Sequence, residues 1–118
     1  MDFKETRPIY MQIADYVCEQ TLSKKWKIGE RILSIRELGA LLEVNPNTVL
    51  RGYDFLQNLN IIANKRGIGY FIEENAVDKI MNFRKERFFK EELPDIFKTM
   101  QLLNIQMSEI AEVYKLFK

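Results

Sequence analysis

Apolar side chains recur at helical spacing in three consecutive segments of the N-terminal half of the chain. The first segment covers residues 8–24, the second residues 34–42 and the third residues 45–59. Pro8 suits the first turn of the first helix, because the N–H that proline lacks has no partner there. The pattern therefore predicts three helices, of which the second and third are joined through the short segment 43–47.

Sequence signals mark where the second and third helices begin. Ser34 and Glu37 form a capping box, in which the serine hydroxyl accepts the N–H of the third helical residue and the glutamate reaches back to the cap. Asn45 is a favoured N-cap, and Pro46 is a favoured first helical residue. We expect the apolar side of the second helix and the connector before it to be buried. These residues are Ile35, Leu38, Leu41 and Leu42 in the helix, and Ile28, Ile32 and Leu33 in the connector.

The third helix has one apolar and one polar side. The apolar side carries Val49, Gly52, Tyr53, Leu56 and Leu59. The polar side carries Asn47, Arg51, Asp54 and Asn58, with Thr48 on the flank near the N-terminus. Two short helices that are joined by a tight turn, the second with a polar outer side, are typical of a helix-turn-helix. The same pattern also occurs in helix pairs that only form a core.

Residues 61–72 predict a β-hairpin, because β-branched and aromatic residues at both ends flank the sequence NKRG. We place the tip of this hairpin at residues 64–67, where Lys65 and Arg66 make it basic. A basic hairpin directly after a helix-turn-helix is the arrangement of a winged helix, although charges are also ordinary in an exposed turn. The sequence therefore predicts a winged helix-turn-helix domain over residues 1–74.

Beyond the hairpin the apolar pattern is helical again. We expect a helix over residues 75–93, an interruption at Pro94, and one or two helices over residues 95–117 with a break near Asn104. Aromatic and methionine side chains are frequent here, and so much apolar surface must pack against something, which indicates a subunit interface. Residues 75–118 are therefore expected to form a helical dimerisation tail. Its expected dimerisation residues are Phe83, Phe88, Phe89, Phe97 and Met100.

The composition limits the chemistry of the chain. Its 118 residues are 47% hydrophobic and 30% charged, which is typical of a soluble globular protein. The predicted helices and hairpin make its fold class mainly α with a small β-hairpin. The absence of histidine removes the commonest general base and the usual zinc ligand, and the single Cys18 excludes an intramolecular disulfide. No motif indicates an enzyme, and no cofactor or metal is expected. No run approaches the ~20 apolar residues of a membrane span, and residues 1–8 are too polar for a secretory signal, so we expect the cytoplasm.

The charge is nearly balanced, with a formal net charge of +1. Five basic residues lie between Lys24 and Arg36 against one acid, Glu30. Near-neutrality does not decide between a nucleic acid and a protein as the partner. A winged helix that serves as a protein-interaction module therefore stays open, whereas the polar outer side of the third helix favours DNA.

Four sequence blocks, in this order, resemble the GntR family of bacterial transcription regulators. They read PIYxQI at residues 8–13, IGERILSxREL at 28–38, VNPNTVxR at 44–51 and RGxGxFI at 66–72. The resemblance covers residues 7–73 closely and the tail more loosely. The short length, without a large effector-binding domain, is similar to the YtrA-type branch of the family.

This resemblance implies a winged helix-turn-helix, double-stranded operator DNA as the ligand, a homodimer through the C-terminal helices, and a repressor. The DNA-contacting positions of the family fall here on Ser34, Arg36, Asn45, Asn47, Thr48, Arg51, Lys65, Arg66 and Gly67. The sequence departs from the family at Leu33, usually proline, at Ile35, usually glutamate, and at Asn60, often glycine. Asn60 tolerates the left-handed conformation that a helix end often needs.

The residue types indicate a role for each position. Arg51 is suited to a guanine and Asn47 to an adenine, whereas Ser34 and Thr48 are better matched to phosphate oxygens. The wing tip, Lys65 to Gly67, is expected in the neighbouring minor groove. A twofold dimer predicts a palindromic operator.

Three alternatives stay open. Asn45 either caps the third helix or reads a base, because one side chain does not do both. Arg36 contacts DNA, or it pairs on the surface with Glu37 or Glu43. A small-molecule effector binds between the tail helices or at the dimer seam, or else the apolar residues there are plain dimer core; the residues concerned are Phe88, Phe89 and Met100.

Overall fold

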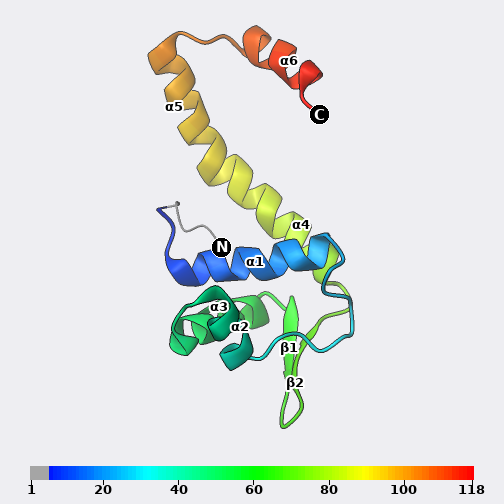
Figure 1. Cartoon of the computed structure of the whole chain (residues 1–118). Coiled ribbons are helices and arrows are strands. Elements are labelled where there is room, and N and C mark those ends of the chain that lie inside the picture. Colours follow the sequence, from blue (N-terminus) through cyan, green and yellow to red (C-terminus); the bar gives the residue numbers. More distant parts are fainter. Residues whose placement is uncertain (1–5) are drawn as a thin grey trace. The chain divides into compact units, whose positions relative to one another are not determined.

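The structure, a computed structural model, describes residues 6–118, so that residues 1–5 of the predicted first domain lie outside it. It is mainly helical with one two-stranded antiparallel hairpin, as predicted (Figure 1). The chain divides into two compact units, which we call the head, ending at Met81, and the C-terminal unit, residues 82–118. The head extends beyond the predicted end of the first domain, because Ala76 and Ile80 are buried in its core.

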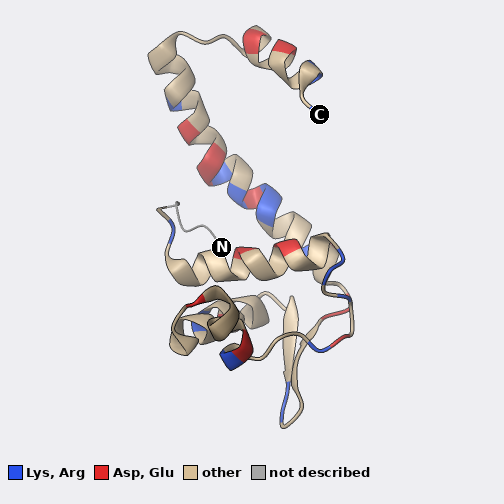
Figure 2. Ribbon diagram, viewed as in Figure 1, with Lys and Arg blue, Asp and Glu red and all other residues tan. Residues whose placement is uncertain are grey.

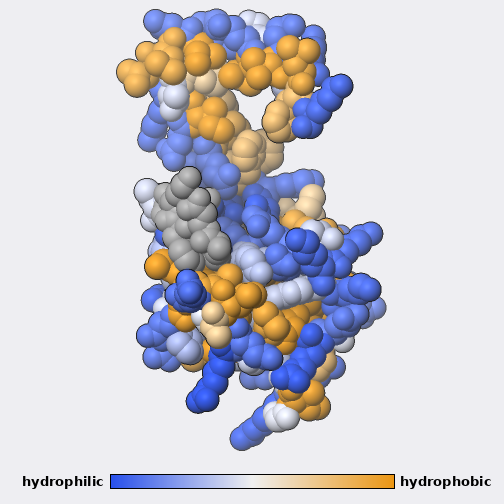
Figure 3. Space-filling view, viewed as in Figure 1, coloured by the Kyte–Doolittle hydropathy of each residue, from blue (hydrophilic) through white to orange (hydrophobic). Residues whose placement is uncertain are grey.

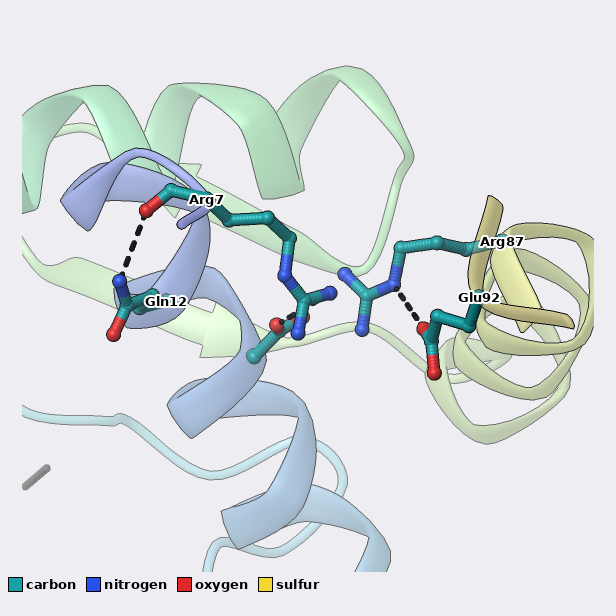
Figure 4. A network of polar contacts seen from close by, with 5 residues as sticks. Arg7, Gln12, Arg87 and Glu92 are labelled. Atoms are coloured by element: carbon teal, nitrogen blue, oxygen red, sulfur yellow. Dashed lines mark hydrogen bonds and ion pairs between the residues drawn. The ribbon is translucent and has the colours of Figure 1, made fainter. Parts of the chain in front are cut away.

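The helices of the head are α1 (Ile9–Leu22), α2 (Ile35–Leu42) and α3 (Pro46–Asn58), and α1 packs across α3 (Figure 1). Pro8 precedes α1 as its N-cap, one residue before the predicted position in the first turn. The chain before α1 is fixed instead by Gln12, which is buried and donates from Nε2 to the Arg7 carbonyl (2.9 Å; Figure 4).

The core of the head draws buried side chains from α1, α2, α3, both strands and the start of α4. The largest of them are Ile13, Leu38, Tyr53, Leu56, Ile61, Ile62, Ile72 and Ile80. Two residues that we expected to be buried are exposed, Leu41 by 59% and Ile28 by 42%. Leu41 lies about 110° around α2 from the midpoint between the buried Leu38 and Gly39, which puts it beyond the edge of the covered side. Ile28 lies just before the point where the connector joins the hairpin: the Gly29 N–H donates to the Ile72 carbonyl (2.9 Å).

The predicted hairpin consists of β1 (Ile62–Lys65) and β2 (Gly69–Ile72). Ile62 pairs with Ile72, and because both side chains are buried this pairing sets the register of the hairpin. The turn then falls at residues 66–68, not at the predicted 64–67. The first two residues of the predicted tip belong to β1.

The C-terminal unit contains the rest of α4 (Ala76–Arg87), a π-helical turn η1 (Phe88–Glu92), α5 (Leu93–Leu103) and α6 (Met107–Leu116). The predicted interruption at Pro94 is wrong, since helical backbone angles continue through Arg87, Glu92 and Leu93. The Leu93 N–H donates to the Phe88 carbonyl, and we attribute the continuity to this wider turn, which makes room for the proline ring. The predicted break near Asn104 is confirmed by its left-handed φ of 55°.

Candidate nucleic-acid interface

The N-terminus of α2 is built around the predicted capping box. The Ser34 Oγ accepts the Glu37 N–H (3.1 Å), and the Ser34 N–H donates to Glu37 Oε1 (2.8 Å). The hydrogen bond from the Ser34 N–H to the carboxylate, a second one from the Ser34 hydroxyl and, to a lesser extent, the charge of Arg31 hold the pKa of Glu37 below its ordinary value. Arg36 is exposed, and within the described part of the chain no ion pair joins it to Glu37 or to Glu43. Its guanidinium therefore faces solvent at the start of a helix.

The N-terminus of α3 is also capped by a side chain. Asn45 Oδ1 accepts the Asn47 N–H (2.8 Å), and the Asn45 carbonyl accepts the Thr48 N–H (2.9 Å). Of its two predicted roles, Asn45 therefore has the capping role in this structure. Asn47 is exposed and Thr48 is half-buried beside it.

Arg51 lies exposed on the outer side of α3, but it does not extend freely into solvent. Its guanidinium carbon is 4.4 Å from the centre of the Tyr10 ring, which belongs to α1. The Tyr10 ring in turn packs edge-to-face on Phe55 of α3, with 6.4 Å between ring centres. Sequence reasoning missed both aromatic neighbours. The only signal for Tyr10 was its place in the first block of the family resemblance.

Tyr53 ties α3 to the start of α2 and to the wing. Its side chain is fully buried, and its hydroxyl donates to the Leu33 carbonyl (2.6 Å), one residue before Ser34. Its ring packs edge-to-face on Tyr70 of β2, with 4.7 Å between ring centres. Burial raises the pKa of Tyr53 well above its ordinary value, so the hydroxyl stays a hydrogen-bond donor throughout the usual pH range.

The hairpin turn carries the cations expected at the wing. Gly67 has a φ of +78°, in the left-handed region that favours glycine, and the turn closes with the Ile68 N–H donating to the Lys65 carbonyl (2.9 Å). Arg66 is exposed at the turn. Lys65 is folded back instead, with its Nζ 4.3 Å from the centre of the Phe71 ring. The turn also exposes Ile68, an apolar residue that sequence reasoning did not single out.

Arg31, in the connector before α2, adds a third cation beside Lys65 and Arg66. The sequence located it only within a basic run. Arg31 forms an antiparallel bridge with Phe71, next to β2. Directly paired residues share one face of a sheet, so Arg31, Phe71 and Lys65 lie on the same side of the hairpin. Arg31 is too far from the hairpin in sequence for a local pattern to predict that the two lie together.

The head brings these residues together from three elements. In Figure 1, α2, α3 and the hairpin lie on the same side of α1. Figure 2 shows basic residues at the start of α2, on α3 and towards the end of β1. The interface therefore combines two capped helix N-termini, a polar helix side and a basic turn.

The C-terminal unit exposes a large apolar surface over α5 and α6 (Figure 3). Of the predicted dimerisation residues, Phe88, Phe89 and Phe97 are exposed, whereas Met100 is only 8% exposed and does not belong to this surface. Helix α6 adds exposed residues that repeat at helical spacing, and its C-cap Phe117 is exposed as well; the helical residues are Met107, Ile110, Val113 and Tyr114. Within residues 6–118 no helix has both the length and the apolar character required to cross a membrane.

The predicted dimerisation residue Phe83 has a different environment. It is half-buried, and the guanidinium carbon of Arg87 is 5.2 Å from the centre of its ring. Arg87 also donates from Nε to Glu92 Oε2 (3.2 Å; Figure 4). Phe83 is therefore engaged within its own chain.

A helix-turn-helix followed by a basic hairpin defines a winged helix-turn-helix protein. Proteins of this class bind DNA through the second helix of the helix-turn-helix, which is α3 in this chain. Over 115 residues the chain is 35% identical to the HTH-type transcriptional regulator YhcF of Bacillus subtilis. The aligned residues cover 98% of this chain and 93% of YhcF. It is 31% identical to the HTH-type transcriptional repressor YtrA of the same organism, over 98% of this chain and 88% of YtrA.

The crystal structure of a GntR-family transcriptional regulator from Bacteroides thetaiotaomicron is 41% identical, with a TM-score of 0.74 over 92% of this chain and 94% of that one. No protein-family model matches the chain. On the strength of these relatives, the chain belongs to the GntR family of DNA-binding transcriptional regulators, in its YtrA-type branch.

Proposed function

We propose that the protein is a repressor that binds a palindromic operator as a homodimer. The observation that carries this proposal is the exposed outer side of α3, which presents Asn47 and Arg51 next to the capped start of α2 and the basic turn of the wing. An asparagine side chain matches the edge of an adenine, and an arginine matches that of a guanine. The relative YtrA is named a repressor, which favours repression over activation.

The N-termini of α2 and α3 bind the phosphates of the DNA backbone. Unpaired N–H groups at the start of α2 attract phosphate oxygens. At the start of α3, Pro46 has no N–H and Asn45 accepts the N–H groups of Asn47 and Thr48, so the attraction there comes from the helix dipole. Glu37 holds Ser34 in the capping box, and the Ser34 hydroxyl donates to a phosphate when it turns away from the Glu37 carboxylate. Thr48 and Arg36 supply further phosphate contacts. Such contacts set the register of α3 in the major groove, and they make the affinity depend on salt.

The wing contacts the groove next to the one that α3 enters. Arg66 stands exposed at the turn, and Gly67 brings no side chain between the backbone and the DNA. Lys65, held over Phe71, adds charge along the hairpin rather than at its end. The wing therefore places one arginine, Arg66, at the minor groove. Lys65 attracts phosphates more weakly from its place along the hairpin.

The exposed apolar surface of the C-terminal unit supports the homodimer. Leu102, Val113, Tyr114 and Phe117 are each exposed by more than 60%, and large apolar patches mark interaction sites. A second copy of the same surface covers it in a twofold dimer, in which the same patch faces itself. Two heads related by a twofold axis read an inverted repeat.

The first test is binding of the purified protein to the DNA upstream of its own gene, at low and at moderate salt. We expect tight binding that weakens steeply with salt, and Arg51→Ala should lose about 5- to 150-fold of the preference over random DNA. Lys25→Ala removes an exposed charge away from α3 and should keep the preference. A wild-type protein with no preference for any DNA would refute the proposal and favour the protein-interaction module instead.

A further inference from the structure

We propose that Tyr10, at the start of α1, is a positioning residue for base reading by Arg51. The inference rests on the proposed role of Arg51 and adds a residue from outside the helix-turn-helix. Its basis is the cation–π contact of 4.4 Å between the Arg51 guanidinium carbon and the centre of the Tyr10 ring. Tyr10 is only half-buried, so this contact lies at the surface of the head.

The close approach of α1 to α3 makes this contact possible. A Cβ on Gly52 would lie 3.0 Å from the Tyr10 carbonyl oxygen and 3.1 Å from Ile13 Cγ2. Any larger side chain at this position would push the two helices apart. Because Gly52 has no side chain, the Tyr10 ring lies within reach of Arg51, which precedes Gly52 and lies on the outer side of α3.

The Tyr10 ring is itself held in place. Phe55, one turn beyond Arg51 on α3, packs edge-to-face against it. Arg51 and Phe55 therefore contact the same ring of α1, and the guanidinium is confined before DNA arrives. A long arginine side chain loses many rotamers when it is fixed on a base, and a side chain that is already confined loses fewer. Tyr10 acts on base discrimination without contacting a base.

A double-mutant cycle between Tyr10 and Arg51 tests this inference. The measured quantity is the ratio of affinities for an operator duplex and a random duplex, determined by fluorescence anisotropy with the full-length protein. Tyr10→Leu should lower the ratio about two- to fivefold, the size of a solvent-exposed cation–π contact. Tyr10→Phe keeps an aromatic ring and should retain the wild-type ratio. In the Arg51→Ala background, Tyr10→Leu should have no further effect.

A matched control is Tyr16→Leu, the same change on the same helix at a tyrosine that packs on Trp26 instead. It should leave the ratio unchanged. Thermal unfolding of every variant separates a loss of stability from a loss of discrimination. If Tyr10→Leu does not fold, Tyr10→Met replaces it, with the same expected loss.

The outcomes separate this inference from the proposed function. If Arg51→Ala lowers the ratio and Tyr10→Leu does not, Arg51 remains the base reader and the role of Tyr10 is refuted. An equal effect of Tyr10→Leu with and without Arg51 also refutes it, because Tyr10 would then act by another route. If Arg51→Ala leaves the ratio unchanged, both the reader and its positioning residue are wrong.

Discussion

The hydrogen bond from Tyr53 to the Leu33 carbonyl gives a stability prediction that can be worked out from the structure. Tyr53→Phe deletes one oxygen atom and keeps the ring, so the edge-to-face contact with Tyr70 and the packing of the core remain. The Leu33 carbonyl loses its donor at 2.6 Å. A buried polar group without its partner costs about 1–3 kcal/mol, and we expect a loss of about 1–2 kcal/mol in the free energy of unfolding.

Urea denaturation measures this loss through the single tryptophan of the chain. Trp26 is half-buried in the head and packs edge-to-face on Tyr16, so its fluorescence reports on the unfolding of this unit. With a urea dependence of about 2 kcal/mol per molar, the middle of the usual range, the midpoint should fall by roughly 0.5–1 M. The protein concentration must be the same for both proteins, because the proposed dimerisation would make stability depend on it.

A second tyrosine provides the control. Tyr16→Phe removes a hydroxyl that makes no hydrogen bond within the described residues, and it should change the free energy of unfolding by less than about 0.5 kcal/mol. The pKa of Tyr53 is raised by burial, so the difference between the two variants should not depend on pH between neutral and mildly alkaline solution. A Tyr53→Phe midpoint equal to that of the wild type would refute the argument that this hydrogen bond stabilises the head.

Three further predictions follow from the surface of the protein. The pKa of Glu37 is lowered in the folded state, so its contribution to the free energy of unfolding is complete above the ordinary pKa of about 4.3 and is lost as the pH falls through the lowered value. Thermal unfolding should therefore show this loss at acid pH in the wild type and not in Glu37→Gln. Parallel curves of melting temperature against pH for the two proteins would contradict it. Arg31→Gln should reduce the slope of log affinity against log salt by about 1, whereas Lys118→Gln, an exposed charge of the C-terminal unit, should not. Equal slopes for wild type and Arg31→Gln would exclude a phosphate contact of Arg31. Val113→Asp should convert the proposed dimer to a monomer in sedimentation experiments, and an unchanged sedimentation coefficient would remove α6 from the proposed interface.

Local signals allowed the starts and ends of helices to be predicted from the sequence. The capping box of α2 and the N-cap of α3 depend on residues within three positions of each other, and both are present as predicted. Asn60 after α3 and Asn104 after α5 adopt the left-handed conformation that asparagine tolerates. These features need no information about the rest of the chain.

Features that depend on tertiary packing were not predictable in the same way. The turn of the hairpin was misplaced because Asn64 is a good turn residue, whereas the buried pair of Ile62 and Ile72 decides the register. Leu41 fits a helical apolar stripe, but which side of a short helix is covered depends on its neighbours. The contact of Arg51 with Tyr10 joins residues of two helices, and a pattern within one helix does not contain it.

Selection from a library of random-sequence DNA tests most directly that α3 reads an operator as part of a symmetric dimer. The purified full-length protein is incubated with the library, and the bound fraction is amplified and sequenced over several rounds. We expect enrichment of one inverted repeat, with the two half-sites at a constant spacing, and loss of this enrichment in Arg51→Ala. Enrichment of a single half-site without symmetry would contradict the dimer, and no enrichment at all would contradict sequence-specific DNA binding.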